Sequence, residues 1–387
     1  MNVALGEICS YRSEKANASN IGSDLYISTE SMAPNKGGIS PASSIPETGR
    51  VSLFRQGDTL VSNIRPYFKK IWHADQNGYC SNDILVFEPN DASISDYLYW
   101  LLSGDQFFDY VMATSKGTKM PRGDKSAIMN YAVPSNDETA RRMIVSIMNP
   151  IQSKIEANTK LNGYLEELAR AVYVSAMQEH ADIASLCDLA EFNPETYSPK
   201  ENWSAVSYID TSALMLNDLA GLQHFNPAEE KLPTRARRKV SNGDILYSTV
   251  RPNQNHYGLL YSPEPHTLAS TAFAVIRPND TIMSPLVYLA LTDARITKTL
   301  QQLAETSTST IPSIRPVDLE RIAVLVPSDE YGSEIADQIG TTFKQIDCNK
   351  RENRKLAAFR DALLPKLMSG EIDVSKIDLT QLNSHLA

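Results

Sequence analysis

Cysteine is scarce in this sequence of 387 residues, and its four copies are widely separated, at Cys9, Cys80, Cys187 and Cys348. The absence of any C-x-x-C pair disfavours a zinc site or a disulfide framework and fits a reducing cytoplasm. No apolar run approaches the roughly 20 residues that span a bilayer. The N-terminal stretch MNVALGEICSYRSEK also lacks the basic start and long apolar segment of a signal peptide. These absences predict a cytoplasmic protein. The length of 387 residues predicts two to four structural units.

Motifs of common catalytic sites are missing as well. The sequence contains no G-x-x-x-x-G-K-[ST] phosphate loop, no G-x-G-x-x-G, no G-x-S-x-G and no H-E-x-x-H. Its six histidines form no ligand cluster. The strings nearest to the Asn/Asp-Pro-Pro-aromatic tetrad of amino-methyltransferases, NPIQ and NPET, lack the second proline and the aromatic residue. These absences favour a recognition protein without metal or catalytic residues. A nuclease or methyltransferase with an unfamiliar site is the alternative.

The sequence also lacks the basic balance that is usual in a nucleic-acid-binding protein, since its net charge is −9. Residues 1–135 hold 12 basic and 14 acidic side chains, and residues 181–327 hold 12 and 16. Any surface that binds phosphate would therefore have to be local.

What the sequence does contain is an internal repeat. The segment GDTLVSNIRP at 57–66 returns as GDILYSTVRP at 243–252, 186 residues later. Four further matches follow the same order: LGEIC with LCDLA, YISTESM with YIDTSAL, FEPND with IRPND, and Pro134 with Pro327. Their offset grows slowly from 181 to 193 residues, which indicates one duplicated unit adjusted by small insertions.

Both copies follow one plan, which predicts an α+β fold. Strand-like runs such as DILVFEP and TAFAVIRP come first, short helices such as SDYLYWLLSGDQFFDYVM and SPLVYLALTDARITKTLQQL follow, and a long helix closes each copy. The long helices are expected from about Glu138 to Tyr173 and from about Glu330 to Met368. We divide the chain into a first globular domain (1–135), a central long helix (136–180), a second globular domain (181–327), a C-terminal long helix (328–375) and a tail (376–387).

The two long helices carry heptad-like apolar positions. In the first helix these are Ile144, Ile147, Ile151, Leu161, Leu165, Leu168 and Val172, and in the second Ile335, Ile339, Phe343, Ile346, Leu356, Phe359 and Leu363. Asn158 and Asn349 are matching polar positions, which in a coiled coil would set the register as buried amides. We expect an antiparallel coiled coil with pseudo-two-fold symmetry. The alternative is two ordinary amphipathic helices, each packing on its own domain, but a length near 35 residues, roughly 50 Å, exceeds what a small domain covers.

Four segments carry residues suited to nucleic acid: RPYFKK (65–70), KGTKMPRGDK (116–125), KLPTRARRK (231–239) and RPNQNH (251–256). Arg and Lys read guanine, Asn and Gln read adenine, and Lys also binds phosphate. The candidates for DNA binding are Arg65, Tyr67, Lys69, Lys70, Lys116, Lys119 and Arg122 in the first copy, and Arg235, Arg237, Arg238, Arg251, Asn253 and Asn255 in the second. The alternative is that each segment is only a solvated face, and that Arg65 and Arg251, which precede proline, bind loop carbonyls.

With these features together, the whole chain resembles the specificity subunits of type I restriction–modification systems. The most specific segment is LLPKLMSGEI within FRDALLPKLMSGEIDVS at 359–375, supported by the paired Gly-Asp phrases, YISTESMAPNKGG and LNGYLEELARAVY. One departure is that the first long helix ends LARAVYVSAMQEHAD, without the LPKL-x-SG closure.

The resemblance implies that each globular domain is a target recognition domain that reads one half of a bipartite site in double-stranded DNA. The helix pair would set the spacer between the halves. The chain itself would be non-catalytic and hold no cofactor. Two modification subunits would carry S-adenosylmethionine, and two restriction subunits would use ATP and Mg²⁺. A coiled-coil adaptor without a DNA role is the alternative from another class.

Overall fold

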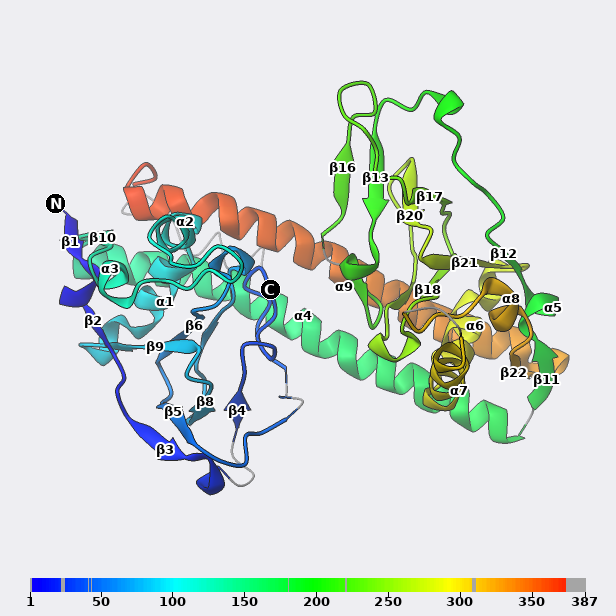
Figure 1. Cartoon of the computed structure of the whole chain (residues 1–387), viewed down its shortest axis with the longest axis horizontal. Coiled ribbons are helices and arrows are strands. Elements are labelled where there is room, and N and C mark those ends of the chain that lie inside the picture. The colour runs from blue at the N-terminus through cyan, green and yellow to red at the C-terminus, as the bar shows by residue number, and fades with distance from the viewer. Residues whose placement is uncertain are drawn as a thin grey trace. The chain divides into compact units, whose positions relative to one another are not determined.

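The computed structural model describes residues 2–21, 25–40, 42, 44–179, 181–219, 221–307 and 311–373, which fold into two compact units (Figure 1). One unit comprises Met1–Ala157 with Glu352–Ala387, and the other comprises Asn158–Arg351. Each unit therefore holds one copy of the repeat and a part of both long helices, α4 (Glu138–Glu179) and α9 (Asp329–Ser369). The predicted tail, 376–387, lies outside the described residues.

The first copy forms two four-stranded sheets and one two-stranded sheet. The first sheet has the order β2-β9-β6-β7 and is antiparallel throughout. The second has the order β3-β5-β8-β4, in which β4 and β8 are parallel, and β1 pairs with β10. The strands are β1 (Asn2–Ala4), β2 (Cys9–Tyr11), β3 (Lys15–Asn17), β4 (Tyr26–Ile27), β5 (Arg50–Phe54), β6 (Thr59–Ser62), β7 (Ile71–His73), β8 (Gly78–Cys80), β9 (Ile84–Pro89) and β10 (Ala132–Pro134).

The second copy repeats this topology except at the edges of its second sheet and in an additional two-stranded sheet, β14-β15. Its first sheet, β12-β21-β18-β19, matches β2-β9-β6-β7 strand for strand, and β11 with β22 matches β1 with β10. Its second sheet, β16-β13-β20-β17, shares three strands with the first copy but has its extra strand beside β13. The strands are β11 (Ala181–Ser185), β12 (Ala190–Phe192), β13 (Val206–Ile209), β14 (Leu214–Met215), β15 (Asp218–Leu219), β16 (Gln223–Phe225), β17 (Ala236–Lys239), β18 (Ile245–Ser248), β19 (Tyr257–Leu259), β20 (Thr267–Ser270), β21 (Phe273–Pro278) and β22 (Ala323–Pro327).

The helical segment after the sheets is divided in two in each copy. Gly104, in extended conformation, separates α1 from α2, and the side chain of Asp293 caps the start of α7 after α6. The shorter helices are α1 (Ser95–Ser103), α2 (Asp105–Ala113), α3 (Lys125–Met129), α5 (Leu186–Leu189), α6 (Ser284–Leu291), α7 (Ala294–Glu305) and α8 (Pro316–Glu320). Single 3-10 turns are η1 (Leu5–Glu7), η2 (Ala18–Asn20), η3 (Pro66–Phe68), η4 (Ala92–Ile94), η5 (Pro199–Glu201), η6 (Thr211–Ala213), η7 (Pro252–Gln254) and η8 (Thr281–Met283).

Each unit has a main apolar core that joins one copy to both long helices. In the first unit, residues of α1 and α2 such as Trp100 and Phe107 pack with Ile147 of α4 and Leu364 of α9. In the second unit, Tyr288 of α6 packs with Tyr173 of α4 and Phe343 of α9, among others. Burial of each large apolar side chain contributes about 1.5–3 kcal/mol, so the long helices are integral parts of both units.

Polar side chains lie between the long helices where they contact each other. Asn158 and Asn349 are buried. Asn349 Nδ2 donates to Asn162 Oδ1 at 2.8 Å in the second unit. In the first unit, Asn353 Nδ2 donates to the carbonyl of Ile155 at 3.2 Å, and Arg360 donates to Gln152 Oε1 at 2.8 Å.

Some of the heptad-like positions predicted for the long helices do not face the protein interior in the C-terminal half of each helix. Leu168 is 55% exposed and Phe359 is 51% exposed, whereas the following residues, Ala169 and Arg360, are buried. A straight α-helix has 3.6 residues per turn, so a strict 3.5-residue pattern drifts by about 20° per heptad. In this half of each helix the buried positions are therefore displaced by one residue toward the C-terminus from the heptad positions. Leu161, which is also exposed, fits the same displacement. Ile144, Ile151, Leu165, Leu356 and Leu363 remain buried or half-buried.

Candidate nucleic-acid interface

The repeated Gly-Asp phrase builds the same structural turn in both copies. Gly57 and Gly243 have φ values of 89° and 85°, which favour glycine. Asp58 and Asp244 follow, almost fully buried, and each accepts a backbone N–H from three residues earlier. Buried carboxylates need charged partners, and here each forms a bidentate ion pair with an arginine.

The partner arginine comes from a different place in each copy, which the sequence comparison did not reveal. Arg12, just after β2, donates to Asp58 at 2.6 and 3.0 Å. Arg277, in β21, donates to Asp244 at 2.8 and 2.9 Å. The hydrogen bond to the aspartate is the main cause that raises the pKa of each arginine. The phrase is thus part of the frame of each domain.

Immediately after the phrase, each copy forms an exposed loop headed by an arginine. Arg65 and Arg251 both adopt the left-handed conformation, with φ of 50° and 47°, and each precedes the proline of a 3-10 turn. The N–H of Arg65 donates to the carbonyl of Pro121 at 2.9 Å, and the N–H of Arg251 to that of Pro312 at 3.0 Å. Both side chains are exposed and make no hydrogen bond or ion pair with other described residues.

The first loop, formed around η3, meets the second basic segment of the first copy. Backbone bridges join Ile64 to Arg122 and Lys116 to Arg122. Arg122 is half-exposed and pairs with Asp83 at 3.1 Å, and the exposed Lys116 pairs with Asp124 at 2.5 Å. Lys119 is exposed, and no ion pair is formed by it within the described part of the chain. The structure therefore brings 65–70 and 116–125 together on one face.

Residues 67–70 divide into outward and inward side chains. Tyr67 and Phe68 are 48% and 38% exposed and contact each other as rings. Lys69, in contrast, pairs with Asp105 of α2 at 2.9 Å. Lys70 donates to the carbonyl of Thr29 at 2.7 Å, and burial lowers its pKa. Arg65 and the two aromatic rings are thus the part of this loop that is open to a ligand.

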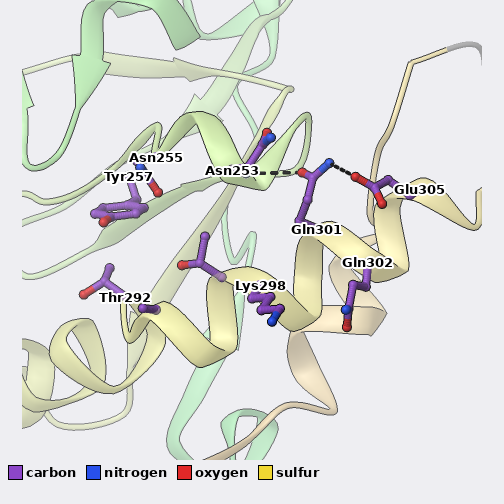
Figure 2. Close-up of a pocket in the computed structure, with 10 residues that line it drawn as sticks. Asn253, Asn255, Tyr257, Thr292, Lys298, Gln301, Gln302 and Glu305 are labelled. Carbon is purple, nitrogen blue, oxygen red and sulfur yellow. Dashed lines mark hydrogen bonds between the residues drawn. The ribbon is translucent and has the colours of Figure 1, made fainter. Parts of the chain in front are cut away.

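In the second copy, the loop around η7 borders a cavity of about 560 Å³ (Figure 2). Asn253 and Asn255 lie on one side of the cavity, and α7 lies on the other. Gln301 of α7 accepts the N–H of Asn253 at 3.3 Å and donates to Glu305 at 2.8 Å. The lining is rich in carboxamide and hydroxyl groups, which are side chains that read base edges.

The third basic segment, 231–239, lies in a different sheet from the η7 loop. Arg235 is exposed, whereas Arg237 and Arg238 are half-buried in β17, at the edge of the second sheet. Burial lowers the pKa of Arg238, and its Nε has no hydrogen-bond partner among the described residues. No hydrogen bond or ion pair joins the described residues of 231–239 to those of 251–256. The second-copy candidates therefore fall into two separate groups.

Lys36 is a structural residue that the sequence did not single out. It lies in the segment YISTESMAPNKGG, and its side chain is 4% exposed. Its Nζ pairs with Asp361 of α9 at 2.9 Å and with Asp105 at 3.2 Å. Burial raises the pKa of Asp105 and of Asp361, but hydrogen bonds from basic neighbours outweigh it and hold both pKa values below the ordinary value.

Three further observations concern other kinds of site. Within the described ranges, no group of three or more His, Cys, Asp or Glu side chains is placed to hold a metal ion. No helix in those ranges is both long enough and apolar enough to cross a membrane. The four cysteines are free, and burial raises the pKa of Cys9 and of Cys80 to about 12.

These features define a duplicated α+β protein with two long helices and two exposed loops, each headed by a left-handed arginine. The fold is that of the type I restriction–modification S subunit from M. genitalium, with a TM-score of 0.56 and 15% identity over 95% of this chain and 96% of that one.

In sequence, the chain is similar to the type I restriction enzyme HindI specificity subunit of Haemophilus influenzae, at 22% identity over 90% of this chain and 94% of the relative. It is also similar to the MjaIX specificity subunit of Methanocaldococcus jannaschii, at 18% identity over 75% and 72%. No protein-family model matches. The predicted resemblance to type I specificity subunits is confirmed.

Proposed function

We propose that this chain is the DNA-recognition subunit of a type I restriction–modification complex. Residues 1–135 and 181–327 act as two target recognition domains, and each reads one half of a bipartite site. The observation that carries the proposal is the loop that is built twice, with a left-handed arginine before proline, fixed by the same backbone hydrogen bond and exposed at its side chain. The half-sites can differ in sequence because the loops continue differently, as YFKK and as NQNH.

The exposed residues next to these loops contact DNA in this proposal. In the first half-site, Arg65 reads a base edge, Tyr67 lies against the DNA, and Lys116, Lys119 and Arg122 supply phosphate contacts. Lys69 and Lys70, which are turned inward, support the loop and reach DNA only if their partners are exchanged.

In the second half-site, Arg251, Asn253 and Asn255 read bases. The DNA backbone is contacted by Arg237 and Arg238 of β17 and by Arg235, which directly precedes this strand. A net charge of −9 means that this binding depends on concentrated loops and on partner subunits.

The long helices, 136–180 and 328–375, act as an antiparallel coiled coil that sets the spacer between the half-sites. Support comes from the order of their contacts within the first unit, where Asn353 bonds to Ile155 and the later Arg360 bonds to the earlier Gln152. In this proposal the two copies are related by a pseudo-two-fold axis, which would present equivalent surfaces to two identical partners.

The chain acts in the cytoplasm as a non-catalytic subunit and directs partner subunits to the site. Two modification subunits carry S-adenosylmethionine, and two restriction subunits use ATP and Mg²⁺. None of these cofactors is assigned to this chain.

The test is selection of preferred duplexes from a randomised DNA library by the complex of this chain with its modification subunit. We expect two short blocks of fixed bases separated by an unspecified spacer, with an affinity that falls steeply between about 0.05 and 0.3 M salt. Binding without base preference and without a salt slope would support the adaptor alternative. Methylation of DNA by the purified chain alone would contradict the non-catalytic role, and methylation-sensitive sequencing of the host genome would give the target.

A further inference from the structure

Lys36 connects the η3 loop to the helix α9 within the first unit. Its backbone N–H donates to the carbonyl of Lys69, which directly follows η3, at 3.0 Å. Its ammonium group pairs with Asp361 of α9 at 2.9 Å. With a side chain only 4% exposed, the ammonium group has lost nearly all contact with water, so its position is set by these carboxylates.

The charges form an alternating series that ends at the loop. Asp361, Lys36, Asp105 and Lys69 follow one another, with contacts of 2.9, 3.2 and 2.9 Å. A second backbone hydrogen bond, from Asn35 to the carbonyl of Phe68 at 2.8 Å, runs beside the series. Asn35 and Lys36 are both in the left-handed region, with φ of 54° and 62°, which brings these two N–H groups to the loop.

The η7 loop of the second copy is also connected to α9, but here the lysine belongs to α9 itself. The N–H of Leu216 donates to the carbonyl of Asn255, which directly follows η7, at 2.9 Å, and Leu216 and Asn217 are again left-handed. Here Lys350 of α9 donates to the carbonyl of Asn217. Each loop is therefore connected to α9 through one lysine. In the first copy this lysine, Lys36, lies in the segment that contacts the loop, and in the second copy it is Lys350 of α9.

We propose that Lys36 and Lys350 are positioning residues for base recognition, Lys36 for the first half-site and Lys350 for the second. This inference rests on the proposed function. Base reading by an arginine requires a bidentate geometry, whereas attraction to phosphate acts over a longer range. A loop released from α9 therefore loses base discrimination before it loses general affinity for DNA.

The experiment compares Lys36→Met and Lys350→Met, each in the full complex with the modification subunit. Affinity is measured on the preferred duplex and on duplexes with one base changed in the first or the second half-site, at one salt concentration. We expect Lys36→Met to lower discrimination at the first half-site about tenfold, comparable to one lost base contact, and to leave the second unchanged. Lys350→Met should do the reverse, so each variant is the matched control for the other.

Two additional measurements separate positioning from loss of folding. Asp361→Asn keeps an acceptor oxygen for Lys36 and removes only a charge, so it should give a smaller loss at the first half-site even if Lys36→Met does not fold. Hydrogen exchange at the η3 amides should rise in Lys36→Met without DNA present. Equal losses at both half-sites, or unchanged discrimination in a folded variant, would overturn the inference alone. A wild-type complex without base preference would overturn the proposed function.

Discussion

Replacement of Asp58 is the sharpest test of whether the repeated phrase is structural. Asp58 is 2% exposed and its partner Arg12 is 5% exposed. Removal of one member of a buried ion pair costs about 3–5 kcal/mol, because the other charge stays buried without its partner. Arg12 keeps contacts with Glu14 at 3.0 Å and Glu88 at 2.9 Å, both substantially exposed. We therefore expect Asp58→Ala to lower the free energy of unfolding of the first unit by about 3 kcal/mol, the low end of that range.

Asp58→Asn is the matched variant, since it keeps the size and one acceptor oxygen. It loses the charged hydrogen bonds, which contribute about 1.5–3 kcal/mol. Urea unfolding followed by hydrogen exchange resolved along the chain is the suitable assay, because two units need not unfold in a single step. The second unit should be unaffected. If Asp58→Ala changed stability by less than about 1 kcal/mol and still abolished DNA recognition, the phrase would belong to the binding site and our reasoning would be wrong.

Four other outcomes are expected. Arg65→Ala should cost about 1–3 kcal/mol of binding and relax one position of the first half-site in the DNA selection, whereas a uniform loss on all sequences would indicate a phosphate contact. Insertion of one heptad within Ile144–Val172 adds about 10 Å of helix, or about three base pairs, so the selected spacer should lengthen while both half-sites stay the same; a changed half-site would contradict the division of roles. Phe359→Glu should leave the unfolding midpoint nearly unchanged while Leu364→Ala costs about 2–5 kcal/mol, and the opposite order would restore the strict heptad register. The pKa of Asp361 is depressed below 3.8, so its stabilising effect is complete at neutral pH and is lost as the pH falls through its folded-state pKa. Acid unfolding should therefore begin at a lower pH in the wild type than in Asp361→Asn. Identical unfolding curves at acid pH would show that the charge of this carboxylate does not stabilise the fold.

The duplication and its main elements were predictable because they depend on local patterns. Alternation of apolar residues and turn residues located β6, β9, β18 and β21, and the long apolar periodicity located α4 and α9 to within a few residues at most ends. The first long helix begins at Glu138 as predicted and continues past Tyr173 to Glu179. The exposed face of each long helix was not predictable to one residue, because supercoiling decides between periods of 3.5 and 3.6.

The partners of charged residues were the part that the sequence could not reveal. Lys69 and Lys70 read as open cations next to Arg65, but Asp105 and the carbonyl of Thr29, distant in sequence, turn them inward. Lys36 carries no local signal of burial, and its partner Asp361 in α9 lies more than 300 residues later in the sequence. Ion pairs between distant segments follow from tertiary packing, which a local pattern does not contain.

The different origin of the arginine that pairs with the buried aspartate, Arg12 in the first copy and Arg277 in the second, has a consequence for recombination between the two copies. Arg12 precedes the repeated phrase, and Arg277 follows it. In the opposite copy, Arg12 corresponds to Asn193, since both donate to the matching strand, and Arg277 corresponds to Glu88. A crossover within the phrase that joins the start of the first copy to the end of the second gives the buried aspartate two arginines.

The reciprocal crossover leaves that aspartate facing an asparagine and a glutamate, with no cation. Exchange between the two halves of such a gene would therefore change the charge around this buried aspartate in opposite directions in the two products.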